Sequence, residues 1–533
     1  MIAHAWHWNR GLAAALLAGC AATGPQNPAP VEGLGSLSFP VTTRSADARR
    51  AFERGALLLH LFHYWEARDA FREAEAADPG MTMAYWGDAM AWNYGVWNQQ
   101  NADSARAVLT RLAPTAGGRR EAARSQREAG YLDVVEVLYG AGSKPGRDTL
   151  YEAAMARLST AFPTDDEARL FHSLALLGLN QGVRDVPTYL RAADIAEDVF
   201  RRHPGHPGAS HYLIHAVDDP AHAARGLEAA RALARSAPDA GHAQHMTSHI
   251  FLALGMWDDV VRANENTLRV FGEHMAAHGH RPPPCGHGQT WLSYGFLQQG
   301  RVDDARAMVR ACAREAEADS SEAVADDIDP DNTSIGSAVF MWARYIIDTE
   351  AWSGEDIAWN PGLDSATTTP AATYHFTAGF AAARRGDLAA ARDRLRRFQA
   401  ARAALRARAR GPADSGPALV EYLTGLDVLE LELEGLVVLG AGDEGGIAAL
   451  RRATVLEDGM AYAFGPPTVH KPSHELLGEE LARLKRLGEA EPEFRTALER
   501  TPRRVASLRG LAQALAGQGK SGPADSITAL LHR

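Results

Sequence analysis

Two segments near opposite ends of the chain share one spacing of small, aromatic and proline residues. The spacing is set by Gly55, Ala67, Phe71, Ala74 and Pro79, and it is repeated without a slip by Gly478, Ala490, Phe494, Ala497 and Pro502. Small residues let two antiparallel helices touch, the aromatic ring fills the gap to the next pair, and proline ends the second helix. Such a unit cannot bury its apolar face alone and must stack on its neighbours. The spacing therefore predicts an all-α chain of stacked helix pairs.

Weaker copies of the unit fill the middle of the chain. Gly255, Gly300 and Gly386 mark turns between the two helices of a unit, and the register places unit starts near residues 48, 207, 241, 286, 372, 427, 471 and 505. Ala, Leu, Arg and Glu, which favour helices, are abundant, and alternating runs typical of strands are nearly absent. The pattern resembles the tetratricopeptide repeat, which implies a right-handed α-α solenoid. We expect an N-terminal solenoid over residues 46–320 and a C-terminal solenoid over residues 321–533.

The N-terminus has the features of a secretion signal. Arg10 precedes the short apolar run 12–18, which is far below the ~20 apolar residues of a membrane-spanning helix. Residues 17–20 read Leu-Ala-Gly-Cys, which resembles the lipobox of bacterial lipoproteins. The resemblance implies cleavage of residues 1–20, a lipidated Cys20 and an outer-membrane location; a cytosolic start with an accidental match is the alternative. Residues 21–45, rich in Ala, Pro, Thr, Gly and Ser, are predicted to be a flexible tether.

Charge and motif content exclude several functions. The net charge is −11 with acids and bases interspersed, which argues against nucleic acid as a partner. Beyond Cys20 only Cys285 and Cys312 remain, enough for one bridge in an oxidising compartment. The sequence has no Gly-rich phosphate loop, no Gly-x-Ser-x-Gly elbow and no His-Glu-x-x-His motif.

Histidines are concentrated in one part of the chain. Twelve of the 21 histidines lie between residues 203 and 287. His211 and His215 are four residues apart, His245 and His249 are four apart, and 34 residues separate the two pairs. The pairs therefore occupy the same positions on the first helices of two successive units. His242 lies one turn before His245 on the first helix of the later unit.

First helices line the concave groove of solenoids of this type, so we expect these side chains to face the groove and to be dispensable for folding. Adjacent first helices lie ~10 Å apart, which brings the two pairs together. Several imidazoles on one patch are typical of a transition-metal site, with zinc or copper favoured and iron a further option. Binding should then weaken as pH falls through ~6.5. Duplication of a unit without selection for metal is the alternative.

A further resemblance concerns the segments around residues 206–215, 242–251 and 471–476, which are similar to a large group of bacterial tetratricopeptide proteins with His-rich repeats. That group implies no particular activity. Ser473 is placed to cap a helix that opens with His474 and Glu475. We predict His474 as an additional metal ligand and Glu475 as a ligand or general base across the groove. A Glu favoured at a helix N-terminus for electrostatic reasons is the alternative for Glu475.

Two smaller features bear on the same site. His287 lies at the second position of the next first helix and would extend the histidine patch, and Trp97 falls where an inserted loop would line the groove.

Two functions remain open. One is a lipoprotein of the cell envelope that binds a transition metal, with catalysis as an option. The other is a scaffold that binds a peptide or protein partner in its groove.

Overall fold

The computed structural model describes residue 31 and residues 33–532 apart from 181, 319–331 and 409–415. The predicted signal, Cys20 and residues 21–30 and 32 of the predicted tether lie outside the described residues. The N-terminal half contains α1 (Ala46–His60), α2 (Tyr64–Ala77), α3 (Thr82–Met90), α4 (Ala102–Leu112), α5 (Ala116–Ala122), α6 (Gln126–Leu138), α7 (Lys144–Ala161), α8 (Asp166–Leu177), α9 (Val186–Arg202), α10 (Pro207–Val217), α11 (Leu227–Ser236), α12 (Gly241–Ala253) and α13 (Trp257–Ala277). The rest contains α14 (His287–Gln298), α15 (Val302–Ala318), α16 (Ser334–Thr349), α17 (Thr369–Arg384), α18 (Leu388–Arg408), α19 (Pro417–Gly440), α20 (Gly446–Asp458), α21 (Ser473–Arg483), α22 (Leu487–Arg500), α23 (Val505–Gly517) and α24 (Ser521–Thr528).

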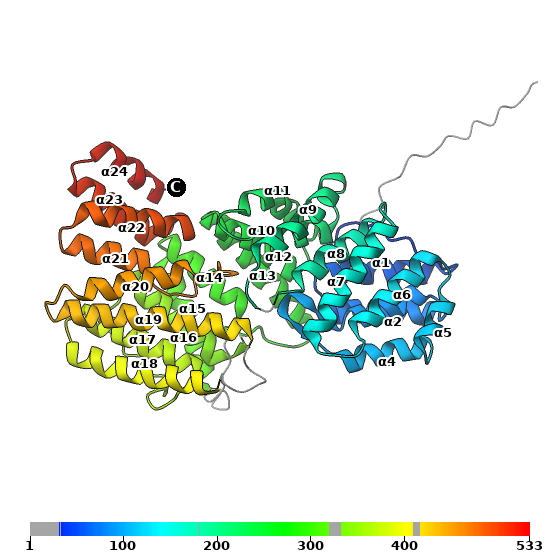
Figure 1. The fold of residues 1–533 in the computed structure, drawn as a ribbon, viewed down its shortest axis with the longest axis horizontal. Coiled ribbons are helices and arrows are strands. Elements are labelled where there is room, and N and C mark those ends of the chain that lie inside the picture. The colour runs from blue at the N-terminus through cyan, green and yellow to red at the C-terminus, as the bar shows by residue number, and fades with distance from the viewer. Residues whose placement is uncertain (1–30, 32, 181, 319–331, 409–415, 533) are drawn as a thin grey trace, which may run out of the picture.

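Successive helices pair and stack into an array, as the spacing predicted (Figure 1). Seven of the eight predicted unit starts lie within three residues of the first residue of a helix; the start at 427 falls inside the long α19. One short hairpin, β1 (Asn93–Tyr94) with β2 (Gln99–Gln100), interrupts the helices after α3. No helix in the described part of the chain is long and apolar enough to span a membrane.

The spacing that the two matching units share has a direct packing reason. An added Cβ on Gly55 would lie 2.9 Å from the Phe71 ring, and one on Gly87 would overlap the same ring from the next helix. The C-terminal unit repeats this arrangement, with Phe494 between Gly478 and Gly510. Each phenylalanine therefore fills a gap that exists only because glycine lies on both sides.

Turns between paired helices recur at one repeat position. Gly255, Gly300 and Gly386 have φ angles of 65°, 72° and 78°, as expected for glycine in the left-handed region. The first unit has Phe62 at the equivalent position, with φ 60°. A bulky residue in this region costs free energy on the order of 1 kcal/mol, which surrounding contacts must offset.

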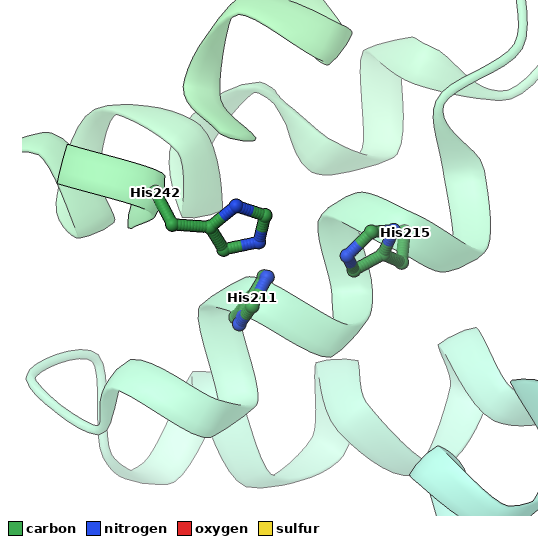
Figure 2. A group of neighbouring side chains, drawn as sticks. All are labelled: His211, His215 and His242. Carbon is green, nitrogen blue, oxygen red and sulfur yellow. The ribbon is translucent and has the colours of Figure 1, made fainter. Parts of the chain in front are cut away.

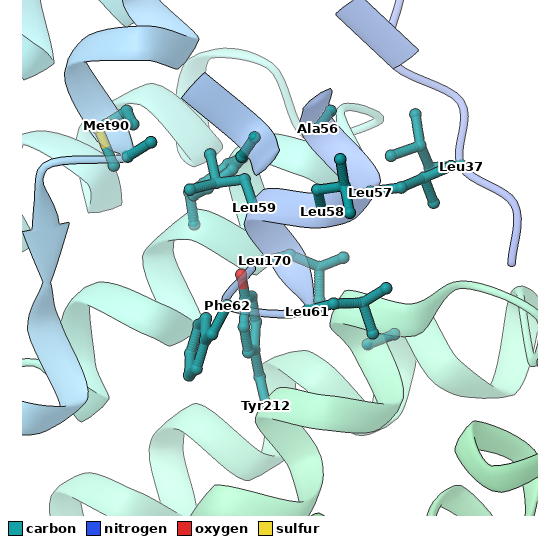
Figure 3. Packing of buried hydrophobic residues seen from close by; sticks show 14 of the residues in the cluster. Leu37, Ala56, Leu57, Leu58, Leu59, Leu61, Phe62, Met90, Leu170 and Tyr212 are labelled. Atoms are coloured by element: carbon teal, nitrogen blue, oxygen red, sulfur yellow. The ribbon is translucent and has the colours of Figure 1, made fainter. Parts of the chain in front are cut away.

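Residues 33–45 differ from the predicted tether. Leu37, Phe39 and Val41 are buried in the first hydrophobic core, whose packing around α1 is shown in Figure 3. The Phe39 ring contacts those of Phe52 and Trp86, with centroids 5.2 and 5.5 Å away. The tether prediction is wrong for this stretch, because its alternate apolar side chains pack into the core between the N-terminal helices.

The predicted boundary at residue 320 does not separate two cores. One hydrophobic cluster includes Val309 and Cys312 from α15 together with Trp342 and Ile346 from α16. A disulfide joins Cys285 to Cys312 and ties the start of α14 to α15.

The array also curls back on itself. The Trp257 indole donates to the Arg503 carbonyl oxygen at 3.0 Å. Arg504 is buried and pairs with Asp348 of α16 and Glu475 of α21. The last repeats are therefore held against the middle of the chain.

Candidate metal centre

Six histidines from three successive first helices meet in the middle of the molecule. They are His211 and His215 on α10, His242, His245 and His249 on α12, and His287 on α14. Their ring nitrogens form two groups of three, His211–His215–His242 and His245–His249–His287, and within each group one nitrogen from every ring lies within 4.8 Å of the others. We name these groups the first and the second triad.

The exposure of the two histidine pairs differs from the prediction. His211, His215, His245 and His249 are buried, with at most 7% of their surface exposed. Only His242, which is half-buried, and His287 reach solvent. The expectation that the pairs face an open groove is wrong, because side chains from other units cover them.

In the first triad the three rings converge on one point (Figure 2). His211 Nδ1 donates to the carbonyl oxygen of His60 at 2.6 Å, which leaves the lone pair on its Nε2 atom. The Nε2 atoms of His211, His215 and His242 are all buried, and no hydrogen-bond partner for them lies in the described part of the chain. Buried polar atoms normally have partners, so these three nitrogens are chemically able to accept a metal ion.

Phe62 forms the wall of this site. Its ring centroid lies 4.3 Å from that of His211 and 5.7 Å from those of His215 and His242. The strained backbone of Phe62 therefore places an aromatic ring against all three imidazoles. Trp97, in the 3-10 turn after β1, lies 5.6 Å from the His242 ring and is 45% exposed, so it borders the site on the solvent side.

Burial keeps the first triad neutral. It lowers the pKa of His211 to about 3 and the pKa values of His215 and His242 well below the ordinary 6.5. Metal ligation requires an unprotonated nitrogen, so all three rings are ready to bind a metal ion at neutral pH.

The second triad is held by hydrogen bonds to its outer nitrogens. His245 Nδ1 donates to Asn264 Oδ1 at 2.8 Å, and His249 Nδ1 donates to Asp218 Oδ2 at 2.7 Å. The Asn264 amide nitrogen donates to the Val260 carbonyl oxygen, which fixes the amide orientation. Partners of this kind orient histidine ligands in metal sites.

These bonds leave lone pairs on the Nε2 atoms of His245 and His249, which lie 3.3 Å apart. Burial lowers the pKa of both rings, for His249 against the opposing effect of Asp218, so a shared proton is disfavoured. Two lone pairs that face each other repel unless a cation lies between them. Two imidazoles on one tetrahedral zinc ion, at about 2.0–2.1 Å from the metal, have nitrogens about 3.3–3.4 Å apart.

The surroundings of the second triad include a charged carboxylate and a pocket. Burial would raise the pKa of Asp218, but the Arg184 guanidinium and His249 hold it at about 2, so a carboxylate stands behind the triad. Trp291 lies against His249, with ring centroids 4.5 Å apart. A pocket beside His249 is lined by Trp257, Trp291, Tyr294, Phe464 and Arg500 among others.

A third group, His60, Glu167 and His206, was not predicted. Glu167 accepts from His60 at 2.8 Å and from His206 at 3.1 Å. The remaining nitrogens bond to the Tyr212 hydroxyl and to the Ala209 amide. Because every ring nitrogen has a partner, this group is a hydrogen-bond network that joins α1, α8 and α10. Isolated His60 and Glu167 carry no spacing signal that would have identified it.

His474 and Glu475 lie away from both triads. His474 bonds to Glu493 at 2.6 Å and to Asp458 at 3.2 Å; burial would lower its pKa, but these carboxylates raise it. Burial would likewise raise the pKa of Glu475, but Arg504 and Lys471 hold it at about 2. The predicted roles of metal ligand and general base do not fit a histidine whose two ring nitrogens are bound to carboxylates and a glutamate that is ion-paired with Arg504 and Lys471. The helix bearing them packs against the repeat that follows and not across the histidines.

No family model matches the chain, and no curated protein matches it. Among solved structures, the human IFIT1 dimer with m7Gppp-AAAA is 11% identical, over 92% of this chain and 91% of that chain, with a TM-score of 0.35. The Cut9–Hcn1 hetero-tetramer of the APC/C is 12% identical over 91% and 76% of the two chains, also with a TM-score of 0.35. Yeast Tom70 is 10% identical over 89% and 96%, with a TM-score of 0.28.

The repeat type is established by the chain's own helix pairs. The recurrent spacing, the phenylalanines held between glycines and the glycine turns all occur where a 34-residue unit requires them. The protein is an all-α solenoid of the tetratricopeptide-repeat type.

Proposed function

We propose that the protein is a lipoprotein of the cell envelope that binds a transition metal ion through its buried histidines. The observation that carries this proposal is a triad whose ring nitrogens lie within 4.8 Å of one another and whose three Nε2 atoms are buried without a partner in the described chain. Neutral imidazoles suit zinc and copper, with iron a further option. Neither thiolates nor carboxylates belong to this triad.

The envelope location rests on two features of the sequence and the fold. Residues 17–20 match a lipobox whose Cys20 would carry the lipid anchor, with the outer membrane as destination. The Cys285–Cys312 disulfide is typical of an oxidising compartment such as the periplasm.

Catalysis is an option within this proposal. Three histidines leave one position of a tetrahedral ion open for water or a substrate. The pocket beside His249 would bring a small molecule against the second triad. A scaffold for a peptide or protein partner is the second candidate, favoured by the repeat architecture, in which stacked units create extended binding surfaces.

The deciding experiment is a titration of chelator-treated protein with zinc and copper, with the His211→Ala/His245→Ala double variant beside the wild type. We expect tight stoichiometric binding and a rise in melting temperature for the wild type, and loss of both in the variant. Equally weak binding by both proteins, with no gain in thermal stability, would reject the metal site and favour the scaffold. Circular dichroism of both metal-free proteins controls for folding.

A further inference from the structure

We propose that the two triads form one two-metal centre, with one ion bound by His211, His215 and His242 and a second by His245, His249 and His287. This inference rests on the proposed function and adds the number, ligands and proximity of the ions. Each triad is complete by itself, since it offers three imidazole nitrogens within 4.8 Å of one another.

The two triads touch along their shared border. The His215 and His249 ring centroids are 5.9 Å apart, and those of His242 and His245 are 6.4 Å apart. A metal ion lies about 3 Å from the centroid of an imidazole that binds it. The two ions would therefore be less than about 12 Å apart, and the range includes the 3.5–4 Å of two-metal catalytic sites.

The repeat explains how such a pair arises. His211 and His245 lie at one repeat position, and His215 and His249 lie at another, so α10 and α12 each contribute one pair. The third ligand of each triad comes from the start of the following first helix, as His242 or His287. Each triad thus spans the junction of two adjacent units, and α12 contributes to both.

Charge and exposure suit two ions with open positions. His242 and His287 are the more exposed members of their triads, so both ions are reached from the N-terminal ends of α12 and α14. Asp218 is a charged group in direct contact with one proposed ligand, because it accepts a hydrogen bond from His249. Six neutral imidazoles do not compensate two divalent ions, so we expect small anions from solvent to accompany the ions.

The test counts copper(II) bound to the full chain and measures its magnetic interaction by electron paramagnetic resonance. The wild type should bind two equivalents and show dipolar broadening or coupling. His242→Ala and His287→Ala, which change the less buried ligands, should each bind one tight equivalent with a spectrum free of that broadening. His278→Ala is the matched control, since His274 and His278 form a histidine pair on the exposed end of α13 with ring centroids 4.5 Å apart.

Outcomes separate this inference from the proposed function. One tight equivalent in the wild type overturns the two-metal centre and leaves a single metal site. Two equivalents with no magnetic interaction overturn the shared centre. No tight binding removes both proposals, and loss of an equivalent in His278→Ala assigns that ion to the surface pair.

Discussion

Asn264 holds the proposed metal ligand His245 in place without belonging to either triad, so its removal isolates the orientation of His245. In Asn264→Ala, His245 Nδ1 loses its acceptor at 2.8 Å and the ring is free to turn or to change tautomer. Loss of such a partner typically weakens metal affinity 10–100-fold, or about 1.4–2.7 kcal/mol. The lost buried hydrogen bond should lower the free energy of unfolding by about 1–3 kcal/mol.

The assay is a zinc titration against a competing chelator, with denaturant unfolding of the metal-free proteins beside it. Thr267→Ala is the matched control: it lies on the same helix and loses a buried hydrogen bond to the Ala263 carbonyl oxygen. We expect Asn264→Ala to weaken one zinc site and Thr267→Ala to keep wild-type affinity. Unchanged affinity in Asn264→Ala, or an equal loss in both variants, would refute the orienting role.

Acid should destabilise the metal-free protein, because His211 has a pKa of about 3 in the folded protein and 6.5 in the unfolded chain. Between these pH values only the unfolded state binds the proton, so the free energy of unfolding falls as pH falls, by about 2 kcal/mol at pH 5 for this residue. Unfolding curves that coincide at pH 7 and pH 5 would contradict the burial of His211. Gly510→Ala should cost about 1–3 kcal/mol in chemical denaturation because its Cβ overlaps the Phe494 ring, whereas Gly522→Ala, which meets open space, should cost nothing. Cys20→Ser should move the protein from membrane to soluble fractions, and a variant that stays in detergent-free membrane pellets would exclude lipid anchoring through this residue.

The helix pairs could be predicted from the sequence because the residues that pack them together recur at fixed spacings within each unit. Phe71 and Phe494 lie between glycines that the 34-residue spacing places on neighbouring helices. The left-handed turn at Gly255 follows from the same register. Contacts between adjacent units join residues that are separated by a fixed number of positions along the chain. That separation can be read from a single sequence.

The burial of the histidines could not be predicted because it depends on contacts between distant units. Phe62, which covers His211, is separated from it by most of the N-terminal repeats, and it occupies a position where several other units have glycine. The repeat pattern gives no sign that α1 packs on α10. For the same reason the proposed metal site should lose affinity at a pH below 6.5 and not near it, because burial lowers the histidine pKa values.

The division into two triads was also out of reach. The 34-residue translation of one histidine pair onto another suggested one shared site, but each pair takes its third partner from the following helix, as His242 or His287. Which rings meet depends on the offset between adjacent first helices, and that offset is set by the packed second helices. The expectation for Glu475 failed for a similar reason, because its carboxylate forms an ion pair with Arg504 from the next repeat.

Anomalous diffraction from crystals grown with zinc, recorded on both sides of the zinc absorption edge, tests the central claim most directly. The account predicts a peak within about 2.1 Å of the Nε2 atoms of the first triad, and a second peak between the Nε2 atoms of His245 and His249. Crystals that contain zinc only at exposed side chains, with both triads lacking anomalous density, would contradict it.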